Sequence, residues 1–146
     1  MKLQVSNTNA PAWRDLTVTS DLPSKLKHLE EIAKNLWWVW NSEAKALFRD
    51  LNPDMWRSSG ENPVILLQHL SSERLDEVIA DPEMMARIEH VYKSFKEYMA
   101  KPMRTDIPSV SYFSMEYGLC NALKIYSGGL GVLALSLIHI SEPTRQ

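Results

Sequence analysis

The chain has 146 residues, among which there is a single cysteine, Cys120, and only five glycines. One cysteine excludes an internal disulfide and a cysteine-rich zinc site, and it favours a cytoplasmic protein. No apolar run approaches the length of about 18 residues that a membrane-spanning helix requires, and the amino terminus lacks the apolar stretch of a secretory signal. Basic residues are not in excess, since 16 against 18 acidic residues give a net charge of −2. This balance argues against nucleic acid or a membrane surface as the partner.

Apolar residues make up 45% of the chain and charged residues 23%, which is typical of one globular domain. From residue 23 to about residue 100, apolar side chains recur every three or four positions, which predicts a mainly α-helical region. One amphipathic helix is expected over residues 26–40. On this helix Trp37 and Trp40 would face the core, and Trp38 would lie about 100° away.

Helix starts are marked by residues that cap a helix, in two cases with proline directly after the cap. These pairs are Asn41-Ser42, Asn62-Pro63, Ser71-Ser72 and Asp81-Pro82. The longest helix should begin at Asp81-Pro82 and carry an apolar stripe formed by Met85, Ile88, Val91, Tyr92, Phe95 and Met99.

Extended structure is predicted at both ends of this helical region. Residues 3–5 and 16–18 alternate apolar and polar side chains and predict a β-hairpin. After a polar connector, residues 109–115 (SVSYFSM) are rich in β-branched and aromatic residues and predict a strand. The fold class is therefore mainly α with short β-strands.

Three of the five glycines lie within the segment Ser127-Gly128-Gly129-Leu130-Gly131. Glycines before a helix let a ligand approach the backbone, and the amides there suit a phosphate group. The same spacing also fits a tight strand-to-helix turn without a ligand, because a short glycine run is a weak motif. No Ser-His-Asp arrangement, pair of catalytic carboxylates or metal-ligating cluster can be assembled from the sequence.

The last twelve residues, 135–146 (LSLIHISEPTRQ), lose the character of the preceding segment. They look like the translation of a transposase-type sequencing-library adapter, and we expect them not to be native. The alternative is a natural tail that resembles the adapter by chance. The segment is set aside in the fold prediction.

Two motifs near the end carry a family resemblance. The strings SYFSMEYGL and KIYSGGLGVLA resemble the start of the catalytic region of bacterial α-glucan (glycogen/starch) phosphorylases. The strings NLWWVWNSEAKALFRDLNPDMW and ENPVILLQHLS resemble the helical N-terminal region of the shorter bacterial and archaeal enzymes. The resemblance covers essentially residues 1–134.

This resemblance implies an N-terminal fragment of a two-lobed GT-B-type fold. Residues 1–105 would be the helical region with its hairpin, and residues 106–134 the start of the N-terminal catalytic lobe. The family releases glucose 1-phosphate from α-1,4-glucan with inorganic phosphate and with retention of configuration. Its pyridoxal phosphate is held by a lysine of the other lobe, so the resemblance implies no catalytic residue and no metal in this chain, which should be inactive alone.

The resemblance also implies roles for five residues. The backbone amides of Gly128, Gly129, Leu130 and Gly131 would face the substrate phosphate, the cofactor phosphate and the sugar. Glu116 would brace this loop from the preceding strand.

Two other functions remain open. A nucleotide-sugar-dependent glucan synthase shares the lobe architecture and the glycine loop, but it carries a lysine where this chain has Tyr126. A free-standing helical carbohydrate-binding or interaction module would explain the tryptophan cluster, but it leaves the glycine loop without a purpose.

Overall fold

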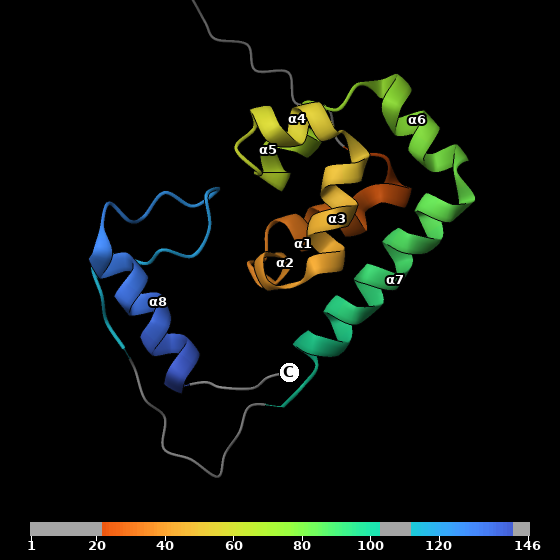
Figure 1. Cartoon of the computed structure of the whole chain (residues 1–146). Helices are drawn as coiled ribbons and strands as arrows, with labels where there is room; N and C mark the ends of the chain where they lie inside the picture. Colours follow the sequence, from red (N-terminus) through yellow and green to blue (C-terminus); the bar gives the residue numbers. More distant parts are fainter. Residues whose placement is uncertain (1–21, 103–111, 142–146) are drawn as a thin grey trace, which may run out of the picture.

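The computed structural model describes residues 22–102 and 112–141, and in this part the chain is mainly helical. The predicted hairpin of residues 3–5 and 16–18 lies outside the described residues. A short 3₁₀ helix, Ser24–Leu26, precedes the helices of Figure 1. Their bounds are α1 (Lys27–Ala33), α2 (Trp37–Trp40), α3 (Ser42–Leu51), α4 (Pro53–Ser58), α5 (Pro63–Gln68), α6 (Ser72–Ala80), α7 (Pro82–Met99) and α8 (Gly129–Ser141).

All four predicted helix starts are confirmed by hydrogen bonds from backbone amides to the side chain of the capping residue. Asn41 accepts one from Ala44 at 2.8 Å, and Asp81 accepts one from Glu83 at 2.9 Å. The caps of α5 and α6 are Asn62 and Ser71. The sequence analysis missed α4, although Asn52-Pro53 has the same cap-and-proline pattern that begins α5. Local capping chemistry therefore accounts for the starts of five consecutive helices.

The prediction of one continuous helix over residues 26–40 is wrong. The helix stops after Ala33, and the Asn35 side-chain oxygen accepts a hydrogen bond from the Trp37 amide at 2.9 Å, which begins α2. This interruption rotates the tryptophans relative to the predicted face. Trp38 is 4% exposed, whereas Trp40 is 51% exposed, the reverse of the expectation for these two. Trp37 packs against the core, as predicted. An asparagine that bonds the backbone two residues on competes with the helical hydrogen bonds.

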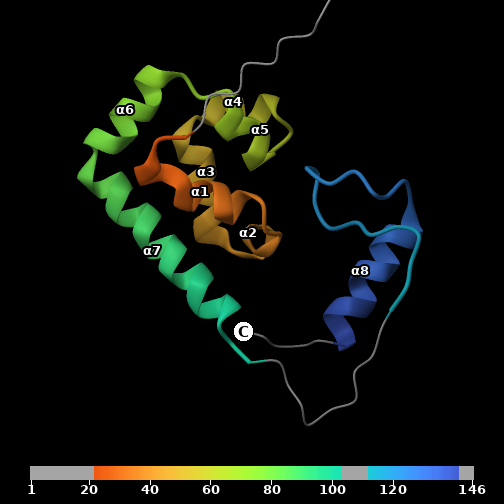
Figure 2. The ribbon, with the colours of Figure 1, turned by 180° about the vertical axis from the view of Figure 1, so that it is seen from behind.

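The core lies where α1, α3, α5 and α7 meet (Figures 1 and 2). Helix α1 packs against α5 and α7, while α3 contacts α2, α4 and α7. Three aromatic side chains meet inside: the Trp38 ring lies edge-on to Phe48 and Trp56, with ring centroids 6.4 and 6.1 Å apart. The apolar stripe of α7 is buried at Ile88, Val91 and Phe95, but it ends before Met99, which is 52% exposed.

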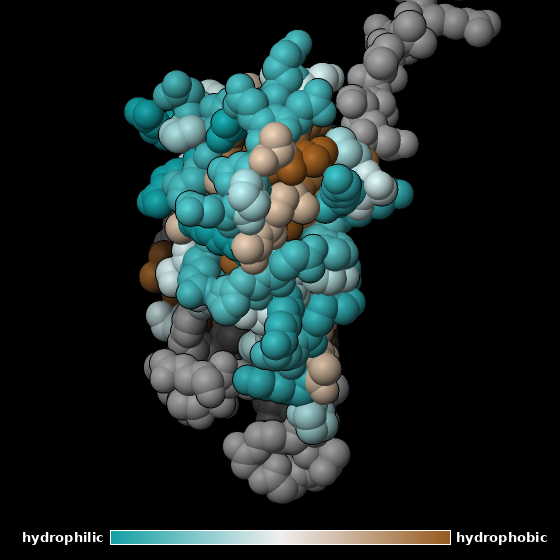
Figure 3. Space-filling view, turned by 90° about the vertical axis from the view of Figure 1, so that its right-hand side faces the viewer, coloured by the Kyte–Doolittle hydropathy of each residue, from teal (hydrophilic) through white to brown (hydrophobic). Residues whose placement is uncertain are grey.

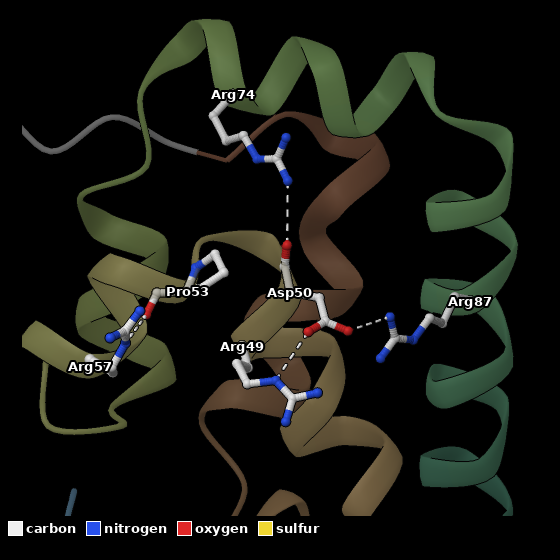
Figure 4. Close-up of polar contacts among 6 residues, drawn as sticks. All are labelled: Arg49, Asp50, Pro53, Arg57, Arg74 and Arg87. Carbon is white, nitrogen blue, oxygen red and sulfur yellow. Dashed lines mark hydrogen bonds and ion pairs between the residues drawn. The ribbon is translucent and has the colours of Figure 1, made fainter.

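Asp50, near the end of α3, joins three helices through charged side chains (Figure 4). Its carboxylate accepts hydrogen bonds from Arg87 of α7 at 2.8 Å and from Arg49 at 3.1 Å. From α6, the Arg74 guanidinium donates to the carbonyls of Leu51 at 2.8 Å and Asp50 at 3.3 Å. Because the last carbonyls of a helix have no helical partner, Arg74 completes the end of α3.

The side of the bundle that carries α6 and α7 is mainly hydrophilic (Figure 3). It holds ion pairs such as Lys96 with Glu31 at 3.0 Å and the i,i+3 pair Arg74 with Glu77 at 2.7 Å. This pattern is the solvent face of an amphipathic helix.

The strand predicted over residues 109–115 is not present in the residues described there, 112–115. Between residues 112 and 128 the described chain is irregular, and its one β-bridge joins Cys120 to Leu123. The Phe113 and Met115 side chains are 90% and 94% exposed. A segment with strand-forming residues becomes a strand only when a partner strand takes up its hydrogen bonds, and no described segment pairs with this one.

Candidate functional site

The glycine cluster forms an exposed loop at the start of α8. Residues 127–130 are exposed, Gly131 is buried, and the helix begins at Gly129, as the sequence predicted. The first turn of a helix has amides without helical partners, and these give its start a partial positive charge. In Figures 1 and 2 this loop and α8 lie beside the helical bundle rather than within it.

The segment before the loop folds back along it through two backbone hydrogen bonds. The Gly118 amide donates to the Gly131 carbonyl at 2.9 Å, and the Tyr117 amide donates to the Ile125 carbonyl at 3.1 Å. Where the chain turns between these two hydrogen-bonded stretches, Cys120 and Ala122 are half-buried and pack against the hydrophobic core of the bundle. The loop is therefore connected to the bundle by a short, tightly turned stretch.

Glu116 lies directly against the loop. One carboxylate oxygen accepts a hydrogen bond from the Ser127 hydroxyl at 2.6 Å, and the other accepts one from the Ser127 amide at 3.2 Å. These bonds from Ser127, with smaller contributions from the Gly128 and Gly131 amides, hold the pKa of Glu116 below its ordinary value of 4.5. An ionised carboxylate therefore sits at the positive end of α8.

The Ser127 side chain was not among the residues to which the sequence analysis gave a role. Its spacing from Glu116, eleven residues apart, carries no local signal. Only the folding back of residues 116–127 brings the two side chains together.

The four glycines in this region differ in what surrounds them. A methyl group on Gly131 would lie 2.6 Å from Cβ of Tyr126 and 3.1 Å from the Gly118 nitrogen, and one on Gly118 would lie 3.3 Å from the Gly131 carbonyl carbon. These two glycines allow the close approach of the two segments. Around Gly128 and Gly129, in contrast, nothing described lies within 4 Å of such a methyl group.

None of the glycines of this loop has a positive φ angle. Among the described residues only Gly60 and Glu61, between α4 and α5, have positive φ, at 67° and 61°. Gly129 is instead the first residue of a helix, a conformation that alanine adopts more readily. Neither backbone strain nor crowding within the described chain explains glycine at positions 128 and 129.

In the described part of the chain, no group of three or more His, Cys, Asp or Glu side chains could hold a metal ion. None of the described helices is long and apolar enough to cross a membrane.

The chain belongs to a protein family described as "Protein of unknown function (DUF3417)", whose profile matches residues 22–123. This match covers the bundle and Glu116 but ends before the glycine loop.

Three relatives have more specific names than this family. The chain is 33% identical over 135 residues to a glycogen phosphorylase of Mycobacterium tuberculosis (strain H37Rv), covering 84% of this chain and 16% of the relative. It is 39% identical over 117 residues to a glycogen phosphorylase of Aquifex aeolicus, covering 78% and 17%. It is also 39% identical over 124 residues to a maltodextrin phosphorylase of Thermococcus litoralis, covering 80% and 15%. These relatives confirm the resemblance to phosphorylases.

The chain spans about one sixth of the length of these relatives. A comparison with solved structures found no match.

Proposed function

We propose that this chain is the N-terminal part of an α-glucan phosphorylase. The whole enzyme would be a retaining glycosyltransferase that uses inorganic phosphate to release glucose 1-phosphate from α-1,4-glucan. The support is the identity of 33–39% to glycogen and maltodextrin phosphorylases over about four-fifths of the chain. Relatives of this kind favour a phosphorylase over the glucan synthase and over the binding module considered from the sequence.

The glycine loop is the proposed binding site because the space around the Cβ positions of Gly128 and Gly129 is open. Glycine within a helix costs about 0.5–1 kcal/mol relative to alanine, and nothing within 4 Å of the Gly129 Cβ position in the described chain requires it there. A ligand that approaches the backbone closely supplies the missing reason. The backbone amides of Gly128, Gly129, Leu130 and Gly131 are the groups proposed to meet it.

Phosphate is the proposed ligand class because of the electrostatics of the loop. The first-turn amides of α8 point outward from the start of the helix, where the macrodipole favours an anion. Preorganised amides stabilise charge that develops on phosphate oxygens without reorganising during the reaction. In the whole enzyme the loop would thus form one wall of the site between the two lobes of a GT-B-type fold.

Pyridoxal phosphate is the proposed cofactor, and the lysine that binds it is expected outside this chain. When bound, the cofactor supplies a phosphate group that exchanges a proton with inorganic phosphate. The exposed loop fits a phosphate group, because the Cβ positions of Gly128 and Gly129 are open. The chain's own contribution is to orient anions through the loop amides, and the chain alone is proposed to be inactive.

The test compares two glycine substitutions in the full-length enzyme. Gly129→Ala should not lower the Tm, because the space at its Cβ is open. It should reduce phosphate-dependent release of glucose 1-phosphate by two to three orders of magnitude, because the added methyl group would keep the phosphate away from the amide and one lost preorganised contact costs about 3–4 kcal/mol. Gly131→Ala is the contrasting variant. It should lower the Tm, because its methyl group would meet Cβ of Tyr126 at 2.6 Å.

Normal turnover by the folded Gly129→Ala enzyme would show that the loop is only a turn. Residues 1–134 alone should give no glucose 1-phosphate, and measurable turnover by that fragment would overturn the assignment.

A further inference from the structure

The hydrophobic core of the helical bundle contains no side chain that could take part in a reaction. Its side chains are apolar, and none of the described polar or charged side chains is buried. A bundle of this kind can still contribute to a binding site by holding another segment in place, because the geometry of a site depends on the residues that support it.

One segment outside the bundle is held in this way. Of the described residues that follow α7, Cys120 and Ala122 are those that pack against the hydrophobic core of the bundle. Both side chains are half-buried, and they lie in the turn formed by residues 118–125. In Figures 1 and 2 this turn points from the start of α8 toward the bundle.

The turn is joined to the start of α8 by short contacts. The Leu123 amide donates to the Cys120 carbonyl at 3.2 Å, and the Ile125 amide donates to the Leu123 carbonyl at 3.0 Å. The Gly118 amide donates to the Gly131 carbonyl of α8 at 2.9 Å. A methyl group on Gly118 would already lie 3.3 Å from the Gly131 carbonyl carbon, so the two stretches are in close contact. A shift of the turn on the bundle would therefore shift the start of α8.

We propose that the bundle positions the glycine loop: its hydrophobic core holds the turn at Cys120 and Ala122, and the turn fixes the place where α8 begins. The inference rests on the proposed function of the loop. It gives the region of the family match, residues 22–123, a role in that function although this region contains none of the loop amides. Firm attachment matters because a displacement of about 1 Å in a site can lower a reaction rate about a hundredfold.

The first experiment uses Cys120, the only cysteine of the 146-residue chain, to report whether the turn is held on the bundle. A short pulse of iodoacetamide, an uncharged reagent, labels the thiol when the turn leaves the bundle. Labelling is measured against urea concentration, in parallel with the far-ultraviolet circular dichroism of the helices. If the bundle holds the turn, the protection of Cys120 is lost at the same urea midpoint as the helices.

Two arginine variants separate docking on the bundle from protection by the turn itself. Arg74→Ala removes the donor to two carbonyls at the end of α3 and should lower both midpoints together by roughly 0.5–1 M urea. Arg57→Ala is the matched control, because its exposed pair with Asp54 contributes little, and it should move neither midpoint. Equally fast labelling of the native and the unfolded chain, or a labelling midpoint that Arg74→Ala leaves in place, would overturn the docking.

The second experiment tests the positioning role in the full-length enzyme. Ala122→Gln places a larger polar side chain where the turn meets the core, and Ala122→Ser is the conservative variant. Ala86→Gln is the matched control, because Ala86 is exposed on α7. Ala122→Gln should lower kcat/KM for phosphate roughly ten- to hundredfold at unchanged helix content, whereas Ala122→Ser should retain most of the activity.

The outcomes distinguish the positioning role from the proposed function. If the parent enzyme releases glucose 1-phosphate and Ala122→Gln has the same kcat/KM as Ala86→Gln, the positioning role is wrong and the proposed function stands. A parent enzyme without phosphate-dependent release of glucose 1-phosphate would overturn the proposed function and the positioning role with it.

Discussion

Replacement of Trp38 by alanine should strongly destabilise the bundle. The side chain is 4% exposed, and its ring contacts Phe48 and Trp56, which are 0% and 6% exposed. Tryptophan-to-alanine changes in a core cost about 3–5 kcal/mol through lost burial and the cavity that remains. The two edge-on ring contacts place the expected loss at the upper end of that range, since each such pair contributes about 0.5–1.5 kcal/mol beyond burial.

Trp40 is the matched control, because it is the same residue type two positions away in the same short helix. At 51% exposure it should cost less than about 1 kcal/mol on replacement by alanine. Urea unfolding of both variants, followed by far-ultraviolet circular dichroism, gives the free energies and shows whether the slope is conserved.

A continuous helix and an interrupted helix predict opposite orders of destabilisation for the two variants. The continuous helix predicted from the sequence would make Trp40→Ala the more costly change, whereas the interrupted helix makes Trp38→Ala the more costly. A larger loss for Trp40→Ala would refute the break at Asn35 and the core built on it.

Four further outcomes are expected. Arg74→Ala should lower the free energy of unfolding by about 1–2 kcal/mol, because two carbonyls at the end of α3 lose their donor. Arg57→Ala, which breaks an exposed pair with Asp54, should change it little in the same urea assay. Burial raises the pKa of Asp50, but hydrogen bonds from Arg87 and Arg49 outweigh it and hold the pKa below 3.8. The stabilising contribution of Asp50 is therefore complete above that value and is lost as the pH falls through the lower, folded-state pKa, so Asp50→Asn should flatten the acid-induced loss of stability. Sequencing of the source DNA should show that residues 135–146 are not encoded by the natural gene; a continuous natural reading frame across the junction would contradict this.

The continuation of α8 from Ala134 to Ser141 does not bear on that last prediction. Leucine favours a helix whatever its origin, so an adapter-derived segment that begins Leu-Ser-Leu can extend a helix that native residues begin.

The helix starts could be predicted from the sequence because capping is local. A side-chain oxygen at Asn41, Ser71 or Asp81 bonds an amide two or three residues further on, so its partner lies within the same few residues. The same logic would have found α4 at Asn52-Pro53.

The orientation of the tryptophans could not be predicted in this way. Periodicity assigns faces only while the helix is continuous, and the break at Asn35 shifts every later residue. Likewise, residues 112–115 have the composition of a strand, yet a strand depends on hydrogen bonds from another segment, which composition does not contain.

For the candidate site, the sequence by itself determined which residue types are present: glycines that leave backbone amides accessible, and an acidic residue eleven positions before the loop. The tertiary structure decided what each one does. Gly118 and Gly131 serve close packing, because they face each other across two segments, whereas Gly128 and Gly129 border open space. Glu116 meets Ser127 only because the chain turns back between them. Distances between residues far apart in the chain depend on the folded path of the backbone, and the sequence pattern does not specify that path residue by residue.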